Sequence, residues 1–312
     1  MKIRLGYACI TNALNVTSSS MMTYKHYKNL GNLRGQEKLD KIIKSNFEAL
    51  KEILKYNIKN EIHFYRMTSN LIPLATHPNV SFEIFNRYKN EFIEIGNIIK
   101  ENNLRVDMHP DQFCVLNSIN DTTINSTINI LEFYQNMFNA MKVKSKLVLH
   151  IGSKANGKKE SMKRFINNFD KLNEELKKMI ILENDDKVYN IKNTLKLATT
   201  LNIPMVLDYH HFKCNHTNEK IEDYIEKIFN TWDSIPKIHF SSPKNKKEKR
   251  SHNEYIDVDE FIKFIEKIKF IDKDFDVMIE AKAHDDAIFR LIRQLKYKTN
   301  YKFIDETTFL VK

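Results

Sequence analysis

The chain alternates short, almost wholly apolar runs with longer segments in which apolar residues recur every three or four positions. Runs of the first kind are typical of buried parallel strands, and segments of the second kind are typical of amphipathic helices. Eight strands are therefore predicted, at residues 3–9, 61–67, 104–109, 146–152, 179–184, 203–211, 235–242 and 275–282. Helices are predicted between and after them, at residues 36–56, 81–102, 122–141, 158–178, 188–201, 219–230, 257–269 and 285–297, with Ser81 as the N-cap of the second.

Strict alternation of eight strands with eight helices indicates parallel crossover units, so the expected fold is α/β, a (β/α)8 TIM barrel. Residues 1–312 are expected to form a single domain, because the six glycines and six prolines leave no flexible linker. Rim loops are expected at residues 11–35 and 243–255. A tail from about residue 298 is expected either to pack outside the barrel or to fray.

The composition is that of a globular protein, with 42% hydrophobic and 29% charged residues. No apolar run approaches the length of a membrane span, and the first ten residues predict a strand and not a signal peptide. Cys9, Cys114 and Cys214 are odd in number and lack a CxxC spacing, which favours a reducing compartment. We therefore expect a cytoplasmic protein with no membrane partner.

The net charge of +10 and the isoelectric point of about 9.2 favour a polyanionic partner such as nucleic acid. Lysine, asparagine and isoleucine are abundant throughout, so a general compositional bias explains part of this charge. Lys244 and Lys246 belong to a basic run at residues 243–250. On a barrel rim this run could neutralise backbone phosphates and make binding depend on salt.

Side chains suited to metal binding follow, or close, six of the predicted strands. In a TIM barrel the ends of all strands meet at one rim, where barrel enzymes place their active sites. An isolated histidine or carboxylate of this kind is usually a hydrogen-bonded or ion-paired structural residue, but so many at one rim are not easily paired with one another. The candidate ligands are His109, His150, Glu183, Asp208, His211, His239, His252 and Glu280.

These ligands are too many for one ion, because a zinc site takes about four, so two or three divalent ions are implied. Imidazole mixed with carboxylate suits zinc, manganese or iron better than magnesium or calcium. Glu183 lies in the middle strand of the set and is the candidate bridging ligand. Clusters of this kind usually cleave phosphate esters.

Eight motifs along the chain closely resemble those of the ultraviolet damage endonucleases. They are LGYAC (Leu5–Cys9), LIPLATHP (Leu71–Pro78), MHPDQF (Met108–Phe113), LVLHIG (Leu147–Gly152), LENDD (Leu182–Asp186), LDYHH (Leu207–His211), PKIHFSS (Pro236–Ser242) and VMIEAK (Val277–Lys282). The resemblance runs from the N-terminus to about residue 282. A more distant likeness is to the endonuclease IV class of abasic-site nucleases.

The resemblance implies a manganese-dependent nuclease that nicks double-stranded DNA immediately 5′ of cyclobutane dimers, 6-4 photoproducts and often abasic sites. Zinc and magnesium are the alternative metals. We expect a monomer that needs no nucleotide cofactor and that joins the nucleoid when it acts, although the sequence itself carries no signal of oligomeric state. The resemblance further implies three groups of ligands: His109, His150 and Glu183; Glu183, Asp208, His239 and Glu280; and His211 with His252.

Further residues take roles from the resemblance alone. Lys237 matches a family lysine that can be carboxylated; the alternative is an unmodified lysine that contacts phosphate. Tyr7 and His77 match residues near the scissile phosphate, although Tyr7 alone would indicate barrel packing. Lys282 is a candidate contact of the phosphate or the leaving group.

The resemblance also assigns a pair of residues that probes the lesion. Gln112 and Phe113 occupy these positions, although Phe113 replaces the usual tyrosine and keeps only the aromatic face. Phe113 packed under its own loop is the alternative. Some members of the family have asparagine at the position of Thr11. Asn12 is expected to make the polar contact with the lesion in place of that asparagine. Apart from Glu183, the residues expected in the reaction are Lys237, Tyr7, His77 and Lys282.

Three other functions fit parts of the pattern. An abasic-site endonuclease would use the same barrel and metals on a different lesion. A metal-dependent sugar isomerase would share the barrel but would need neither a basic rim loop nor a probing aromatic residue. A DNA-binding protein that holds metal without catalysis would not need the full ligand set.

Overall fold

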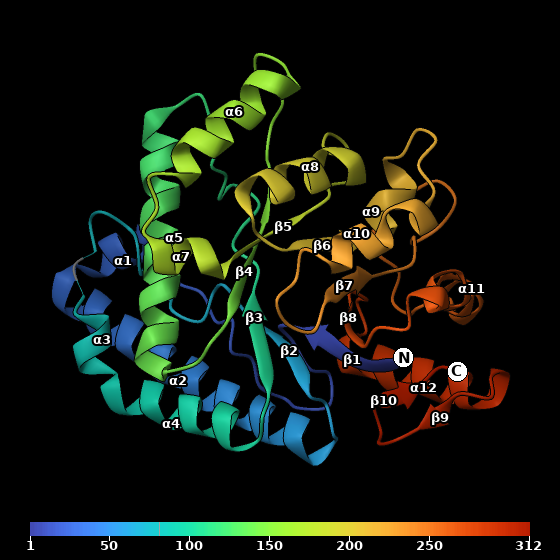
Figure 1. Ribbon diagram of the computed structural model, residues 1–312. Coiled ribbons are helices and arrows are strands. Elements are labelled where there is room, and N and C mark those ends of the chain that lie inside the picture. The colour runs from blue at the N-terminus through green and yellow to red at the C-terminus, as the bar shows by residue number, and fades with distance from the viewer. Residues whose placement is uncertain (81) are drawn as a thin grey trace.

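The structure is a computed structural model that describes residues 1–80 and 82–312, so the predicted N-cap Ser81 lies outside the described residues (Figure 1). Eight parallel strands form a closed barrel, because β1 pairs with β8 on one side and with β2 on the other. This confirms the predicted TIM barrel. The barrel strands are β1 (Lys2–Ala8), β2 (Phe64–Met67), β3 (Arg105–Met108), β4 (Lys146–His150), β5 (Ile180–Glu183), β6 (Met205–Asp208), β7 (Lys237–Phe240) and β8 (Phe275–Ile279).

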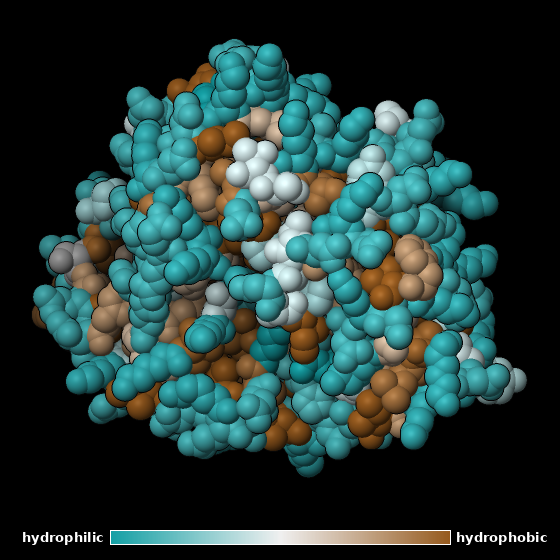
Figure 2. All heavy atoms as spheres, viewed as in Figure 1, coloured by the Kyte–Doolittle hydropathy of each residue, from teal (hydrophilic) through white to brown (hydrophobic). Residues whose placement is uncertain are grey.

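Helices follow each barrel strand and form the outer layer (Figure 1). Hydrophilic residues cover most of the face seen in Figure 2, as amphipathic helices require. The principal helices are α2 (Asn32–Lys59), α4 (Lys89–Glu101), α5 (Asp121–Met141), α6 (Lys158–Phe169), α8 (Ile191–Leu201), α10 (Ile225–Phe229), α11 (Val258–Ile268) and α12 (His284–Lys298). The short helices are α1 (Tyr24–Leu30), α3 (Ile84–Arg87), α7 (Glu174–Met179), α9 (Tyr209–Cys214), η1 (Ile221–Asp223) and η2 (Lys269–Ile271). None of the described helices is both long and apolar enough to cross a membrane.

Several predicted elements differ from the structure: the helix predicted at residues 81–102 is replaced by α3 and α4, and the one at 219–230 by η1 and α10. Three further differences have clear local reasons. The helix predicted at residues 158–178 is divided into α6 and α7, because the Asn173 side chain accepts from Leu176 N and starts a new helix. The strand predicted at residues 203–211 stops at Asp208, whose carboxylate caps α9 by accepting from His211 N. The predicted rim loop 11–35 contains α1 and the start of α2.

Side chains along each strand alternate between the helix layer and the barrel interior, since successive residues of a strand point to opposite faces. On β8, Phe275, Val277 and Ile279 join the large apolar core beneath the helices. Asp276 lies between them and points into the barrel, where Arg4 and Arg105 both pair with it at 2.6 Å. Ion pairs therefore occupy part of the barrel interior.

The C-terminal tail packs against the barrel through β9 (Lys302–Phe303) and β10 (Thr308–Leu310). β10 pairs with the first residues of β1, whereas β1 reaches β2 only at its last residues. The Thr307 hydroxyl donates to Glu61 O at 2.6 Å, and Leu5 N donates to Thr307 O at 3.0 Å. The tail thus fills the seam between β1 and β2, and both termini lie side by side (Figure 1).

Candidate metal centre

The candidate ligands gather at one rim because side chains two residues apart on a strand point to the same face of the sheet. His239 lies two residues after Lys237 on β7, and both side chains point into the barrel. His109 stands in the same relation to Asp107, just beyond β3. Each strand from β3 to β8 therefore carries an interior side chain and, two residues later, a candidate ligand at the rim.

Glu183 lies at the middle of the cluster and is only 1% exposed. Its Oε2 is 3.0 Å from His109 Nε2 and 3.8 Å from His150 Nε2. Its Oε1 is 2.9 Å from His239 Nδ1 and 3.5 Å from His211 Nδ1. Two carboxylate oxygens directed to two different sets of imidazoles give the geometry expected of a bridging ligand.

Two groups of side chains have ligand atoms that all lie within 4.8 Å of one another: His109, His150 and Glu183; and Glu183, Asp208, His239 and Glu280. They have the membership of the first two predicted groups. Among the described residues, His211 and His252 do not complete a third group of three. His211 Nδ1 lies near two carboxylates, 3.5 Å from Glu183 Oε1 and 3.6 Å from Asp208 Oδ2, and His252 Nδ1 lies 4.0 Å from Glu280 Oε2.

Backbone carbonyls fix the orientation of two imidazoles. His109 Nδ1 lies 2.9 Å from Pro110 O, and His211 Nδ1 lies 2.9 Å from Asn184 O. A carbonyl oxygen can only accept, so each Nδ1 carries a proton, and Nε2 is the ring nitrogen that could bind an ion in exchange for its own proton. Histidines that bind metal are usually held in this way.

The charges of the cluster suit bound cations. Asp208 is fully buried, and its Oδ2 has no hydrogen-bond partner among the described residues. Burial raises the pKa of Asp208 well above its usual range, whereas the Asp208 and Glu183 carboxylates overcome the effect of burial on His211 and raise its pKa to about 9. A divalent ion beside Asp208 would supply the missing partner, so the donor set fits the metal centre that the sequence predicts.

Arg66 is a further member of the cluster that the sequence analysis missed. It lies on β2, is 6% exposed, and donates to Glu280 Oε1 at 2.6 Å and to His239 Nε2 at 2.8 Å. Its Nε is 3.8 Å from Asp107 Oδ1. An arginine inside an apolar strand was the available signal, because such a charge needs a buried partner. The positive charge of Arg66 therefore compensates for the negative charge of the carboxylates in the second group, from the side of the barrel interior.

Replacing Arg66 with methionine is expected to lower the free energy of unfolding of the metal-free protein by about 3–5 kcal/mol, because it leaves buried carboxylates without their partner. The loss should be smaller with manganese present, since a bound cation compensates for part of the missing charge. Denaturant unfolding with and without manganese measures both. The matched control is Arg87→Met, which removes a half-exposed ion pair with Asp40 and should cost less than about 1 kcal/mol. An Arg66 variant as stable as the parent would contradict the assignment.

Lys237 is fully buried below His239 and forms an ion pair with Asp107. Its ammonium also lies 5.6 Å from the centre of the Phe64 ring. Burial lowers the pKa of Lys237 to about 8, although the Asp107 carboxylate opposes this shift. Lys237 therefore lies in the layer of side chains beneath the candidate ligands. Its ammonium contacts Asp107 and does not reach the open rim.

Two of the residues expected near the scissile phosphate lie apart from the cluster. Tyr7 is fully buried, packs 5.2 Å from the Tyr65 ring and donates to Asn57 Oδ1 on α2 at 2.7 Å. This position on the helix side of β1 does not agree with a phosphate contact. His77 stacks on Tyr24 at 4.0 Å in the loop after β2, and no described contact joins it to Glu183. Lys282 is exposed at the rim just after β8.

The expected DNA contacts lie on loops at the same rim. Gln112 and Phe113 follow β3, and the Phe113 side chain is 75% exposed, so it does not pack under its own loop. Asn12 is exposed, and its backbone N–H donates a hydrogen bond to Asp285 Oδ1 at 2.6 Å. Lys244 pairs with Glu248 within the basic loop. Lys246 instead lines a cavity of about 630 Å³ beside α9.

A closed parallel barrel with a histidine and carboxylate cluster at one rim defines a broad class of barrel enzymes with candidate metal centres. Within this class the chain belongs to the UV-endonuclease UvdE family, which matches residues 3–308. It is therefore an endonuclease. The family resemblance found in the motifs is confirmed over nearly the whole chain.

Relatives of known name agree with this assignment. The UV DNA damage endonuclease of Bacillus mycoides (strain KBAB4) is 38% identical over 315 residues, which cover 99% of each chain. That of Bacillus cereus (strain B4264) is 38% identical over 302 residues, covering 95% of each. The crystal structure of SacUVDE matches with a TM-score of 0.87 and 31% identity, covering 95% of this chain and 98% of that one. A D-tagatose 3-epimerase-like protein has a TM-score of 0.60 at 15% identity and shares the fold alone.

Proposed function

We propose that this endonuclease nicks duplex DNA immediately 5′ of ultraviolet photoproducts, with two or three divalent ions, of which manganese fits best. The proposal is carried by one observation: the cluster around Glu183 and the exposed Phe113 lie on the same rim, because the candidate ligand His109 and Phe113 both belong to the loop that follows β3. A site that hydrolyses phosphate and a side chain that can enter a base stack are the two parts such a reaction needs. The abasic-site endonuclease remains the second candidate, because it needs the same parts.

The residues divide into those that would hold ions and those that would hold DNA. The two groups of ligands that share Glu183 would each hold one ion, and His211 with His252 would complete a third site. Ions held there would supply an activated water and stabilise the departing oxygen. His239 and Glu280 would keep their orientation through the hydrogen bonds from Arg66.

DNA would be held mainly through its phosphates. Lys282, which is exposed at the rim, and Lys246, which lines the cavity beside α9, would contact them. Gln112 and Phe113 would enter the gap that weakly stacked lesion bases leave, since extruding such bases costs less than extruding normal ones. Asn12 is exposed where it could contact the lesion. A monomer without nucleotide cofactor suffices for this scheme, and it would act on DNA inside the cell.

The test is a nicking assay on three duplexes of one sequence: undamaged, with a single thymine dimer, and with a single abasic site. The expected result with manganese is a nick immediately 5′ of the dimer and none in the undamaged duplex. Cleavage of the abasic duplex alone would establish the second candidate. Equal cleavage of all three would rule out lesion recognition.

Replacing Phe113 with alanine is expected to reduce nicking of the dimer duplex by about 10–100-fold, because stacking of one base on an aromatic ring contributes about 1–3 kcal/mol. The Phe113→Tyr variant keeps the ring and should nick at least as fast as the parent. Phe270→Ala is the matched control, because this phenylalanine is also exposed but lies on η2, between α11 and β8. Initial rates on the dimer duplex measure the effect. Equal losses for Phe113→Ala and Phe270→Ala would argue against a wedge.

A further inference from the structure

Asp285, at the start of α12, is fully buried, although it is neither a candidate metal ligand nor a candidate DNA contact. Its Oδ1 accepts from Asn12 N at 2.6 Å, and its Oδ2 accepts from the Thr11 and Tyr56 hydroxyls, both at 2.8 Å. Thr11 and Asn12 belong to the loop after β1, whereas Tyr56 comes from α2. One carboxylate therefore joins this loop to two helices.

The hydrogen-bond partners that the structure describes for Asp285 are all uncharged donors. Burial, together with the hydrogen bond to Asp285, raises the pKa of Tyr56 above its usual range, so the Tyr56 hydroxyl keeps its proton and donates. A buried carboxylate without a cation is costly unless hydrogen bonds satisfy its oxygens. The first turn of α12 also favours a negative charge at this position. An asparagine of the same shape would offer only one acceptor oxygen, so these contacts require a carboxylate.

Three successive residues of the loop after β1 are directed at this carboxylate, because Ala13 N also lies 3.4 Å from Asp285 Oδ2. Residues 14–16 make no hydrogen bond to another element within the described part of the chain. The Asn12 side chain is exposed, and its amide nitrogen donates to Ala283 O at 3.2 Å. Its carbonyl oxygen, for which no partner is described, can therefore accept a hydrogen bond from a base.

The segment that carries Asp285 is also tied to the candidate metal centre. Glu280 lies five residues before Asp285, and between them Lys282 N donates to Asn253 O at 3.0 Å, in the loop that carries His252. Cys9, at the start of the loop after β1, and the residue before Asp285 adopt positive φ angles of 62° and 45°. Such conformations persist only where the surrounding contacts fix them. The loop is therefore held at a fixed place relative to Glu280.

We propose that Asp285 is a positioning residue for lesion recognition, which holds the loop after β1 so that Asn12 meets the damaged base at a fixed place relative to the metal centre. The inference rests on the proposed function, because it requires Asn12 to contact the lesion. Asp285 is itself fully buried and acts only through the loop. Its loss should therefore weaken recognition of the dimer and leave the cutting step unchanged.

The experiment compares Asp285→Asn with Asp286→Asn in single-turnover nicking of the dimer duplex with manganese. Asp286 is exposed in the same turn of α12, so both variants remove one negative charge from the same place. Its weak contact with Asn12 Nδ2, at 3.4 Å, can be kept by an asparagine oxygen. The protein concentration at half the maximal rate gives the affinity for the dimer duplex, and competition by unlabelled undamaged duplex gives the affinity for normal DNA. The maximal rate reports the cutting step separately.

Asp285→Asn should lower the ratio of affinities for the dimer and undamaged duplexes by about 3–10-fold, as expected for the loss of one hydrogen bond. Its maximal rate and manganese content should stay close to those of the parent. Asp286→Asn should keep the parental ratio. Asn12→Ala should lower the ratio as much as Asp285→Asn does, and the double variant should lose no more than either single variant, because both act through one contact.

A parental affinity ratio in Asp285→Asn overturns the inference, and so do losses that add up in the double variant. A loss confined to the maximal rate also overturns it, because Asp285 would then support the metal centre. Thr11→Val keeps the shape of its side chain and removes one donor to the same carboxylate, so it should lower the ratio in part even if Asp285→Asn folds poorly. A parent without preference for the dimer duplex refutes the proposed function and this inference together. A parent that prefers it, with an unaffected Asp285→Asn, refutes this inference alone.

Discussion

Replacing Glu183 with glutamine is expected to lower the nicking rate by at least about 10³-fold. Mutating a residue that only hydrogen-bonds to a metal ligand already lowers metal affinity or activity by about 10–100-fold, and Glu183 is itself a candidate ligand. Glutamine keeps the shape of the side chain but removes its negative charge. Glu183 is the one residue shared by both groups of candidate ligands, so its loss weakens two ion sites together. Nicking of the dimer duplex and the manganese content of the purified variant measure the two consequences.

The matched control for this variant is Glu174→Gln. Glu174 is exposed on α7 and forms a surface ion pair with Lys177, so both the nicking rate and the metal content should stay at the parental value. Circular dichroism separates loss of function from loss of fold. A Glu183 variant with full metal content and parental rate would show that the carboxylate is not a ligand, and the proposed centre would have to be abandoned.

The gathering of the candidate ligands at the rim was predictable because their positions depend only on where the strands end. An inward residue such as Glu183 or His239 is identified by the two-residue period of its own strand. The same rule applied to β1 places Tyr7 on the helix side, since Arg4 points inward to Asp276 and Tyr7 is an odd number of residues away. The expected position of Tyr7 near the scissile phosphate comes from the motif resemblance alone, and the burial of Tyr7 on the helix side does not support it.

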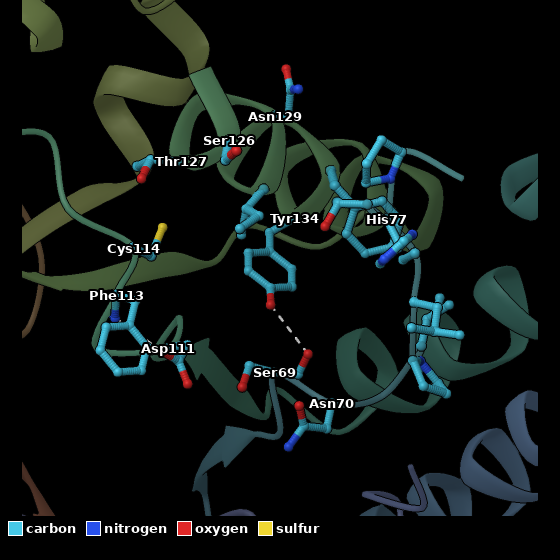
Figure 3. Close-up of a pocket in the computed structure, with 18 of the residues that line it drawn as sticks. Ser69, Asn70, His77, Asp111, Phe113, Cys114, Ser126, Thr127, Asn129 and Tyr134 are labelled. Carbon is cyan, nitrogen blue, oxygen red and sulfur yellow. Dashed lines mark hydrogen bonds between the residues drawn. The ribbon is translucent and has the colours of Figure 1, made fainter. Parts of the chain in front are cut away.

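Contacts across the barrel were not predictable from the sequence. Arg66 meets Glu280 because barrel closure brings β2 close to β8, although 214 residues separate the two side chains in sequence. The pairing of Lys237 with Asp107 spans 130 residues in the same way. A strand pattern gives the face on which a charge lies but not its partner, which depends on the register and tilt of the closed sheet. A cavity of about 750 Å³ beside α5 (Figure 3) depends in addition on the paths of the loops after β2 and β3, which form two of its walls.

Removing divalent ions is expected to abolish nicking and to lower the melting temperature of the protein. Glu183, Asp208 and Glu280 lie together in the interior, and Asp208 Oδ2 lacks a hydrogen-bond partner within the described part of the chain. An ion that binds only the folded state stabilises it by about 2.7 kcal/mol at a concentration 100 times its Kd. For a chain of this size that corresponds to about 5 °C. Thermal unfolding of the chelated protein, with manganese added back, measures the shift.

The magnitude of the shift with different ions identifies the preferred metal. Manganese should restore both the melting temperature and nicking, and should do so at lower concentration than magnesium, because imidazole ligands favour manganese over magnesium. The Glu183→Gln variant provides the internal control: its melting temperature should respond weakly to manganese, since both groups of ligands lose their shared carboxylate. If chelation leaves the parent with its full rate and melting temperature, the buried carboxylates must be neutralised by protons and by Arg66 alone, and the cluster is a structural network instead of a metal centre.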